Sequence, residues 1–339
     1  MMFIRPVRGS DREALLELGR AAGHGMTTVP KSPEQINHRI DQSARAFSSK
    51  GKANADHIFY MVLEEDGEVV GTCCIFPNLG EKRPFYSYRI AHLSAQDQKR
   101  NIRSETDILM LVNDYHGYTE IGTLFLLPEK RGGGRGRLLS FARFMLMAID
   151  KARFGDQIMA EIRGWSGDDG IFPFYEHIAQ KFFQISFLEA DKRSAHDHQF
   201  IADLMPKYPV YTDLLPQEAI DVIGKPHPSS KPAMDLLIDQ GFRYHKLIDI
   251  FDGGPSIEAP ISEIKTIRLA QRRKVEIGTP PKDGAKAIIS TTDMGNFVCM
   301  QTMMDAQGDT LVLTQKQADI MNLAKGDDIL ASPLFSKSK

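Results

Sequence analysis

A glycine-rich segment in the middle of the chain has the residue types that bind an anion. It reads Arg-Gly-Gly-Gly-Arg-Gly over 131–136, directly after the strand-like stretch 119–127 and before a helical pattern over 137–150. A helix start offers free NH groups and the positive end of the helix dipole. Glycines let a phosphate approach the backbone, because no side chain keeps it away. The segment therefore predicts a site for an anion such as a pyrophosphate.

Three nucleotide-binding motifs compete for this segment. A P-loop needs Gly-Lys-Ser or Gly-Lys-Thr, and the sequence contains neither. A dinucleotide fingerprint needs a third glycine at the position of Leu139. The pattern R-x-x-G-x-G, formed by Arg131, Gly134 and Gly136, resembles the coenzyme A signature of the GNAT acyltransferases. The alternative is a flexible turn whose arginines are solvated.

Strands and helices must position this loop, and both are readable from hydrophobic spacing. Strands are predicted over 2–7, 57–64, 68–76, 85–92, 119–127, 157–163 and 242–251, and 106–112 is open between helix and strand. Helices are predicted after a capping box at Ser10 and Glu13, after Ser32-Pro33, and over 137–150, 172–181 and 231–240. The fold class is α+β (mixed α/β), with a GNAT-like core.

The length of 339 residues favours more than one domain. The break Asp252-Gly253-Gly254-Pro255 marks the main boundary. We expect a GNAT-like core with the coenzyme A loop over 1–185. Residues 186–255 are interpreted as a second acyltransferase-like half, which contributes His227. Residues 256–339 alternate between β-formers and polar turns, which predicts a small β-rich appendage.

Composition excludes several classes of function. The net charge of −2 gives no basic footprint for nucleic acid or anionic lipid. No apolar run is long enough to span a bilayer. The apolar run among the first residues is too short for a signal peptide. Cys73, Cys74 and Cys299 lack disulfide or zinc spacing, so we expect no metal and a reducing, cytoplasmic location.

Several further segments, taken in order, resemble one family over roughly residues 1 to 330. They are the opening strand and helix, Asn113-Asp114 with Gly117, Thr123-Leu124-Phe125-Leu126, Ser140-x-x-Arg143-Phe144-Met145, Pro173-Phe174, Lys181-x-Phe183, Leu204-Met205-Pro206-Lys207-x-Pro209-x-Tyr211, His227-Pro228 and Ile248-Asp249-Ile250-Phe251-Asp252-Gly253-Gly254-Pro255. Together they are similar to the arginine N-succinyltransferases. This likeness is far more specific than the loop alone.

The resemblance implies a reaction and its partners. The family forms N2-succinyl-L-arginine from succinyl-CoA and L-arginine, and some members accept ornithine. Succinyl-CoA is then a co-substrate, and no tightly bound cofactor is expected. By resemblance Leu124 contacts succinyl-CoA and His227 donates a proton. The chain is expected to form a homo-oligomer or to pair with a related subunit.

Proton transfer needs a base for the amine and an acid for the departing thiolate. His227 lies between Pro226 and Pro228, which favour an extended backbone and could aim the imidazole into a cleft. The alternative is a surface histidine in a proline-rich turn. His116 is a rival base, although a turn explains its surroundings, and Tyr175 is a rival acid that packing explains equally well.

Other candidate residues would hold the two substrates. Backbone groups of Leu124, Phe125 and Leu126 are expected to bind the thioester and the pantetheine arm, and Arg131 and Arg135 to approach the phosphates. Glu161 could accept the forked hydrogen bonds of a guanidinium, or pair with Arg163 or Arg89. Arg89 is also the candidate cation for the succinyl carboxylate.

Overall fold

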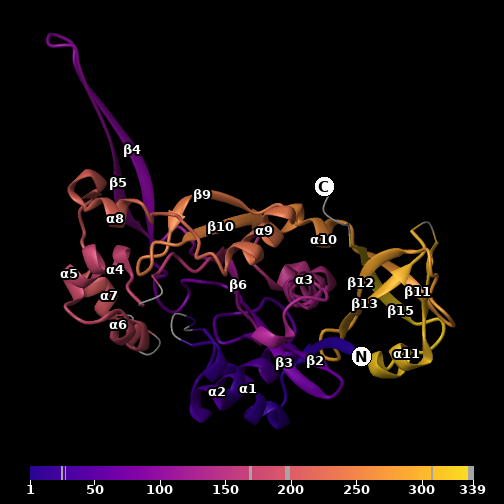
Figure 1. Ribbon diagram of the computed structural model, residues 1–339. Coiled ribbons are helices and arrows are strands. Elements are labelled where there is room, and N and C mark those ends of the chain that lie inside the picture. The colour runs from indigo at the N-terminus through magenta and orange to yellow at the C-terminus, as the bar shows by residue number, and fades with distance from the viewer. Residues whose placement is uncertain (24–25, 27, 168–169, 195–198, 307, 335–339) are drawn as a thin grey trace.

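The computed structural model describes residues 1–23, 26, 28–167, 170–194, 199–306 and 308–334. One hydrogen-bonded sheet of 15 strands runs through this part of the chain, in the order β14-β11-β15-β12-β13-β1-β2-β3-β6-β7-β10-β9-β4-β5-β8 (Figure 1). The strands are β1 (Met2–Pro6), β2 (Phe59–Glu65), β3 (Glu68–Phe76), β4 (Ser87–Asp97), β5 (Ile102–Val112), β6 (Thr119–Leu126), β7 (Gln157–Glu161), β8 (Val210–Tyr211), β9 (Arg243–Ile248), β10 (Pro255–Pro260), β11 (Gln271–Ile277), β12 (Ala285–Thr291), β13 (Cys299–Met304), β14 (Thr310–Leu313) and β15 (Asp328–Pro333).

Helices cover this sheet and confirm the mixed α+β class. They are α1 (Arg12–Ala21), α2 (Pro33–Ser48), α3 (Arg135–Ile149), α4 (Pro173–His177), α5 (Ala179–Phe183), α6 (Phe187–Ser194), α7 (Gln199–Leu204), α8 (Gln217–Ile220), α9 (Lys231–Asp239), α10 (Lys265–Arg268) and α11 (Gln315–Met321). In Figure 1, α1 and α2 lie together beside β2 and β3, and α3 lies between the central strands and the C-terminal unit.

The starts of the first two helices have different causes. Ser32 caps α2 as predicted, since its hydroxyl accepts a hydrogen bond from the Gln35 backbone NH at 3.2 Å. The capping box expected at Ser10 is wrong, because α1 begins at Arg12 after a short 3-10 turn over Gly9–Asp11. Asp11 is buried and binds the Arg5 guanidinium at 2.8 and 2.9 Å. That buried ion pair fixes the start of α1 against β1.

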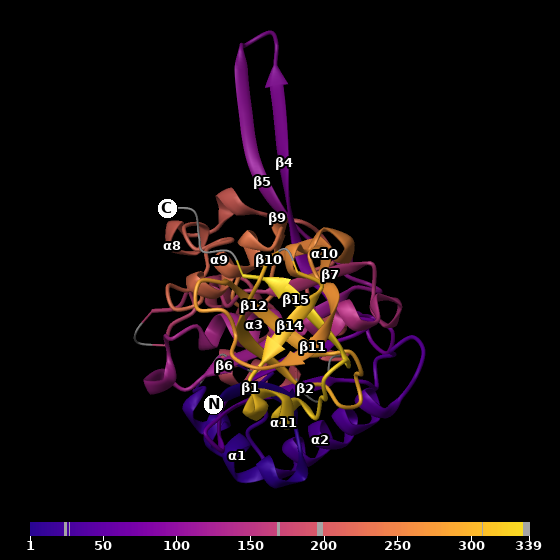
Figure 2. The ribbon, with the colours of Figure 1, turned by 90° about the vertical axis from the view of Figure 1, so that its right-hand side faces the viewer.

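The open assignment of 106–112 resolves as strand, because β4 and β5 pair along their whole length from Ser87↔Val112 to Asp97↔Ile102. This hairpin forms a long arm that projects from the body (Figures 1 and 2). Only its base joins the larger sheet, where β4 pairs with β9 at Tyr88 and Arg89 and β5 pairs with β8 near Ile108.

The expected boundaries at 185 and 255 stay a prediction, and the common sheet runs across both of them. Residues 186–255 form no separate sheet among the described residues, since β9 lies inside the common sheet between β10 and β4. The strand that starts at the expected boundary, β10, pairs with β7 and β9, so Pro255 belongs to the central sheet. The pairing of β10 needs glycine at position 254, because a Cβ there would stand only 2.2 Å from the Ile162 carbonyl oxygen. We therefore propose that the C-terminal unit begins near residue 271.

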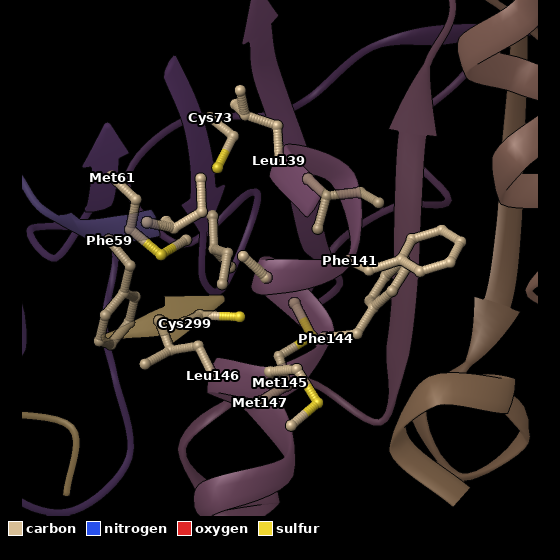
Figure 3. Close-up of a cluster of buried hydrophobic side chains, with 14 of the residues drawn as sticks. Phe59, Met61, Cys73, Leu139, Phe141, Phe144, Met145, Leu146, Met147 and Cys299 are labelled. Carbon is tan, nitrogen blue, oxygen red and sulfur yellow. The ribbon is translucent and has the colours of Figure 1, made fainter. Parts of the chain in front are cut away.

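A single core cluster joins the C-terminal unit to the central strands through α3. Nearly every side chain of α3 from Leu138 to Met147 is buried, which is typical of a helix covered on all sides. Figure 3 shows these side chains packed together with those of neighbouring strands, namely Phe59, Met61, Cys73 and Cys299. The packing fixes α3, and with it the loop at its N-terminus.

Candidate active site

Two parallel strands, β6 and β7, diverge in the middle of the sheet. They pair only at Thr119↔Ile158 and Glu120↔Met159. Beyond this point β7 continues in register with β10, where Ala160 lies opposite Ile257. In the part of the chain that the structure describes, the edge of β6 from 121 to 126 therefore has no strand partner on the β7 side. Such an edge offers main-chain hydrogen-bonding groups to a ligand.

A β-bulge shapes this open edge. Thr72 lies opposite Phe125 and Cys74 opposite Gly122, so that Thr123 and Leu124 together face one residue of β3. Thr123 has a φ of 51°, a left-handed conformation that is strained for a β-branched residue. Bulges are common beside active sites because they redirect the backbone.

The three residues expected to contact the acyl-CoA are all on this bulged edge. Leu124 and Leu126 pack against the core cluster that contains α3, whereas Phe125 is buried in the cluster formed with α1 and α2. Their side chains thus support the strand from both faces. Along the open edge, backbone groups are therefore available to a ligand beside the partly buried side chains of Leu124 and Leu126.

The glycine loop has the conformation that the anion-site prediction requires. Gly132, Gly133 and Gly134 have φ values of 95°, 59° and 83°, which glycine adopts without strain. Within the described residues no acceptor binds the backbone NH groups at the loop and the first turn of α3, those of Gly133, Gly134, Gly136 and Arg137. These NH groups form a cradle for an anion at a helix N-terminus.

The two arginines of the motif have different surroundings. Arg135 binds Glu65 at the end of β2, with Nη2 2.6 Å from Oε1 and Nε 3.0 Å from Oε2. This pair holds the pKa of the Glu65 carboxyl below its usual range and ties the loop to the sheet. Arg131 is exposed beside the loop. The guanidinium of Arg135 therefore anchors the cradle in this structure.

Acidic side chains, which we call the acidic floor, lie on β6 and β7 where the two strands diverge; sequence analysis named Glu161 and missed Glu120. Glu120 and Glu161 lie on one face of the two strands, since Glu120 is in register with Met159 and side chains alternate. Burial raises the pKa of Glu120 to about 7. Burial, and then the nearby Asp249, also raise the pKa of Glu161 well above its usual value. Glu120 can therefore exchange a proton near neutrality, and Glu161 favours its protonated form more than an exposed glutamate does.

Two further carboxylates reach Glu161 from the turn before β10. The Asp249 carboxylate accepts the NH groups of Phe251 and Asp252, each at 2.7 Å. Asp252 accepts the NH groups of Gly164 at 2.7 Å and Gly254 at 2.8 Å. Burial and the Asp249 charge raise the pKa of Asp252 to about 8. The sequence signal was an Asp-x-x-Asp spacing directly before Gly-Gly-Pro.

His227 lies on a loop beside the residues that directly follow β7, next to the acidic floor. Its backbone NH donates to the Arg163 carbonyl at 2.8 Å, and Pro226 forms an isolated antiparallel β-bridge with Gly164. The Ser229 backbone NH donates to His227 Nδ1 at 3.1 Å, which places the proton of a neutral ring on Nε2. The proline-flanked loop is thus hydrogen-bonded to the strand that carries Glu161.

The other charged candidates have hydrogen-bond partners of their own. Arg89 binds Asp114, with its Nε 3.1 Å from Oδ2, at the base of the arm. Arg163 donates to the Ser166 hydroxyl at 3.3 Å. Neither arginine pairs with Glu161 in the described structure. Tyr175 is buried and donates to the Ile185 carbonyl at 3.1 Å, which favours a packing role.

Other site types were searched over the described residues only. These hold no group of three or more His, Cys, Asp or Glu side chains arranged to bind a metal ion. No helix among them is both long and apolar enough to cross a membrane. The three cysteines are buried, and burial raises the pKa of the Cys73 thiol to about 12.

Known proteins match this chain over its whole length. The family model described as "Arginine N-succinyltransferase beta subunit" matches residues 2–266, and its C-terminal domain model matches 271–333. "Arginine N-succinyltransferase subunit beta" of Pseudomonas aeruginosa is 37% identical over 341 residues, covering 100% of both chains. "Arginine N-succinyltransferase" of Escherichia coli is 36% identical over 342 residues, covering 100% of this chain and 99% of the other.

A solved structure has the same fold throughout. It is that of "arginine/ornithine succinyltransferase subunit AI from Pseudomonas aeruginosa", which aligns with a TM-score of 0.90 and covers 99% of each chain at 27% identity. The likeness includes the C-terminal unit as well as the strands around the site.

Glu120 predicts a distinctive dependence of stability on pH. Its folded pKa of about 7 lies above the ordinary value of 4.5, so its contribution to stability is full below pH 4.5 and is lost as the pH rises through 7. The Glu120→Gln variant should lose this slope and be more stable than the parent at pH 8. Urea unfolding midpoints from pH 5 to 8.5 measure the effect. The exposed Glu17→Gln is the control, and parallel curves for Glu120→Gln and the parent would contradict the assignment.

Proposed function

This chain belongs to the arginine N-succinyltransferase family, and we propose that it transfers the succinyl group of succinyl-CoA to the α-amine of L-arginine. The observation that carries this proposal is the cradle of free NH groups of Gly133, Gly134, Gly136 and Arg137 beside the unpartnered edge of β6. The cradle suits a diphosphate, and the edge suits the amide-containing arm that follows it in coenzyme A. An acidic floor at the end of that edge suits a cationic acceptor.

The backbone binds the acyl donor in this proposal. The pyrophosphate occupies the cradle, and the pantetheine arm extends along Leu124 to Leu126. The thioester carbonyl then lies at the bulge, where main-chain NH groups stabilise the oxyanion that forms on attack. Thr123, with its φ of 51°, supports this placement because it turns the backbone of the next residue out of the regular ladder.

Glu120 is the general base that we propose for the arginine amine. The amine must lose a proton before it can attack the carbonyl carbon, and a base with a pKa near 7 is matched to that task. Burial supplies that pKa at Glu120. The cysteines are not needed as nucleophiles, since direct attack by the amine forms the amide in one displacement.

His227 is the proton donor for the departing thiolate. As the imidazolium, the ring can donate from Nδ1 to the Ser229 Oγ, 2.7 Å away, and give its Nε2 proton to the sulfur, which leaves a neutral imidazole. The loop is fixed to β7 through the Arg163 carbonyl, close in sequence to Glu161. This arrangement supports a proton donor on the loop beside the end of β7, whereas the proposed base is on β6.

Glu161 binds the guanidinium of the acceptor in our proposal, with Asp249 and Asp252 beside it. The raised pKa values mean that part of this group stays protonated while the cleft is empty. A guanidinium favours the ionised carboxylates and offers forked donors to two oxygens. Ornithine, named for the solved relative, would place a single ammonium there.

An assembly of subunits is part of the proposal. The relative from Pseudomonas aeruginosa is named a subunit, which supports pairing with a related chain or with a second copy. The β4–β5 arm, which projects from the body, supports the same idea, because a two-stranded ribbon has little stability of its own.

Thiol release from a panel of acyl-CoA thioesters and amines tests the reaction itself. We expect turnover with succinyl-CoA and L-arginine, weaker turnover with L-ornithine, and little with acetyl-CoA. A preference for acetyl-CoA would overturn the substrate assignment. Activity that appears only after a related subunit is added would identify this chain as a supporting partner.

The coenzyme A cradle can be tested at Gly136, where a Cβ would meet no atom within 4 Å and the backbone needs no positive φ. Gly136→Ala should therefore fold with unchanged stability. A bound phosphate would meet the new methyl group, so KM for succinyl-CoA should rise about tenfold or more, with KM for arginine unchanged. Calorimetric titration of coenzyme A gives the same comparison directly. Unchanged affinity would place the pyrophosphate elsewhere.

The proton-transfer roles predict different kinetic signatures. In the parent enzyme kcat/KM should rise with pH through about 7, because Glu120 must be ionised to act as a base. Glu120→Gln should lose this step and roughly 10²- to 10⁴-fold of the rate, whereas His227→Ala should be slow but keep the step. Thermal melting verifies that both variants fold. A pH step that persists in Glu120→Gln refutes its role, and normal turnover in His227→Ala refutes that of the histidine.

A further inference from the structure

A cavity in the C-terminal unit has no role in the reaction proposed above. Its volume is about 360 Å³, which is within the range of small-molecule sites. Gln301 and Met303 of β13 and Lys286 of β12 line one side, and Thr314 and Gln317 at the start of α11 line another. Among the described residues that line it, none is acidic. The cavity therefore suits an anionic ligand better than a cationic one.

The cavity forms where β1 and β13 separate. In the described structure these strands pair only at Ile4↔Cys299. Continued pairing would place Met1 opposite Thr302, and both residues line the cavity instead. Gln317 Nε2 donates to the Thr302 hydroxyl at 3.3 Å, which ties α11 to this edge of β13. Regular elements on several sides therefore build the cavity.

Strand β13 runs from the packed part of α3 past the N-terminus of that helix. Cys299 belongs to the core cluster that contains α3. Two residues later, Gln301 Nε2 lies 3.5 Å from the carbonyl oxygen of Gly134, the residue directly before α3. Met303 follows on the same face, roughly 7 Å further along the strand, and Lys286 lies opposite it on β12. The face that covers α3 thus continues beyond the cradle as a wall of the cavity.

The lining offers one group for each part of a phosphorylated adenosine. Lys286 is exposed and supplies a cation for a phosphate. The side-chain amide of Gln301 has a donor beside an acceptor, which matches the hydrogen-bonding edge of adenine. Met1 and Met303 supply thioethers, which make favourable contacts with aromatic rings. Coenzyme A has such a nucleoside, since its pyrophosphate continues into adenosine with a phosphate on the ribose 3′-oxygen.

We propose that this cavity binds the 3′-phosphoadenosine end of coenzyme A, with Lys286 at the 3′-phosphate and Gln301 at the adenine. This inference rests on the proposed function, because it takes the pyrophosphate to lie in the cradle at the start of α3. The cavity begins at the residue that approaches Gly134, so the nucleoside can follow directly from that pyrophosphate. The acidic floor, with Glu120 at the start of β6, is then at the opposite end of the bound donor. The C-terminal unit contributes directly to the donor site in this proposal, besides supporting α3.

Dephospho-coenzyme A, which lacks only the 3′-phosphate, tests the role of Lys286. We would titrate coenzyme A and dephospho-coenzyme A calorimetrically into the full chain, using the parent, Lys286→Met and Lys325→Met. The parent should bind dephospho-coenzyme A about tenfold more weakly than coenzyme A. Lys286→Met should bind coenzyme A about tenfold more weakly and dephospho-coenzyme A less than about twofold more weakly, because only the former loses a charge-assisted contact. The control Lys325→Met changes an exposed lysine of the same unit that pairs with Glu276, and should alter neither affinity.

Adenosine 3′,5′-bisphosphate distinguishes a subsite for the donor from an independent nucleotide site. We expect it to inhibit competitively with succinyl-CoA, and to bind about tenfold more weakly to Lys286→Met. Inhibition that is not competitive overturns the inference. So does an equal loss of both coenzymes in Lys286→Met, or an unchanged affinity for coenzyme A. A parent chain that binds no coenzyme A refutes the proposed function itself, and this inference with it. Melting temperatures within a few degrees of the parent verify that the variants fold.

Discussion

The divergence of β6 and β7 is the constraint on which the rest of the site depends. A buried strand normally satisfies its main-chain groups on both sides, and here β6 and β7 stay joined only at Thr119↔Ile158 and Glu120↔Met159, while β10 pairs with the other edge of β7. The open edge of β6 can face a ligand because Leu124 and Leu126 pack on one cluster while Phe125 packs on another. Strain at Thr123 is thereby held in place by packing on both faces of the strand.

The C-terminal unit contributes to the site indirectly, through α3. The helix is buried on all sides, between the central strands and the strands of that unit, so the loop at its N-terminus cannot shift independently. Gln301 of β13 also approaches the loop, with its Oε1 3.4 Å from the Cβ position of Gly134. Arg135 adds a third restraint through its ion pair with Glu65. The result is a preorganised cradle, which lowers the entropic cost of binding a flexible cofactor.

Local patterns allowed some of this to be predicted, and long-range pairing explains what was not. The glycine loop, the β2–β3 hairpin and α3 follow from turn chemistry and hydrophobic spacing, so they were readable. The place of β10 inside the sheet was not readable, because Asp252-Gly253-Gly254 looks like a linker unless Gly254 is known to pass Ile162 closely. Glu120 carries no motif. Its significance arises only when β6, β7 and the turn before β10 come together, which no local pattern encodes.

Burial of the acids has a cost that makes sense only with a cationic substrate. Glu120, Glu161 and Asp252 have raised pKa values chiefly because burial disfavours their charge, so the empty cleft keeps them partly neutral. A guanidinium beside Glu161 would reverse that preference, and the same rise in local positive charge would favour ionised Glu120. Binding of the acceptor would then favour the ionised form of the base that deprotonates its amine. In our proposal the buried carboxylates, which a stable core would avoid, therefore couple recognition of the amine substrate to the proton transfer that activates it.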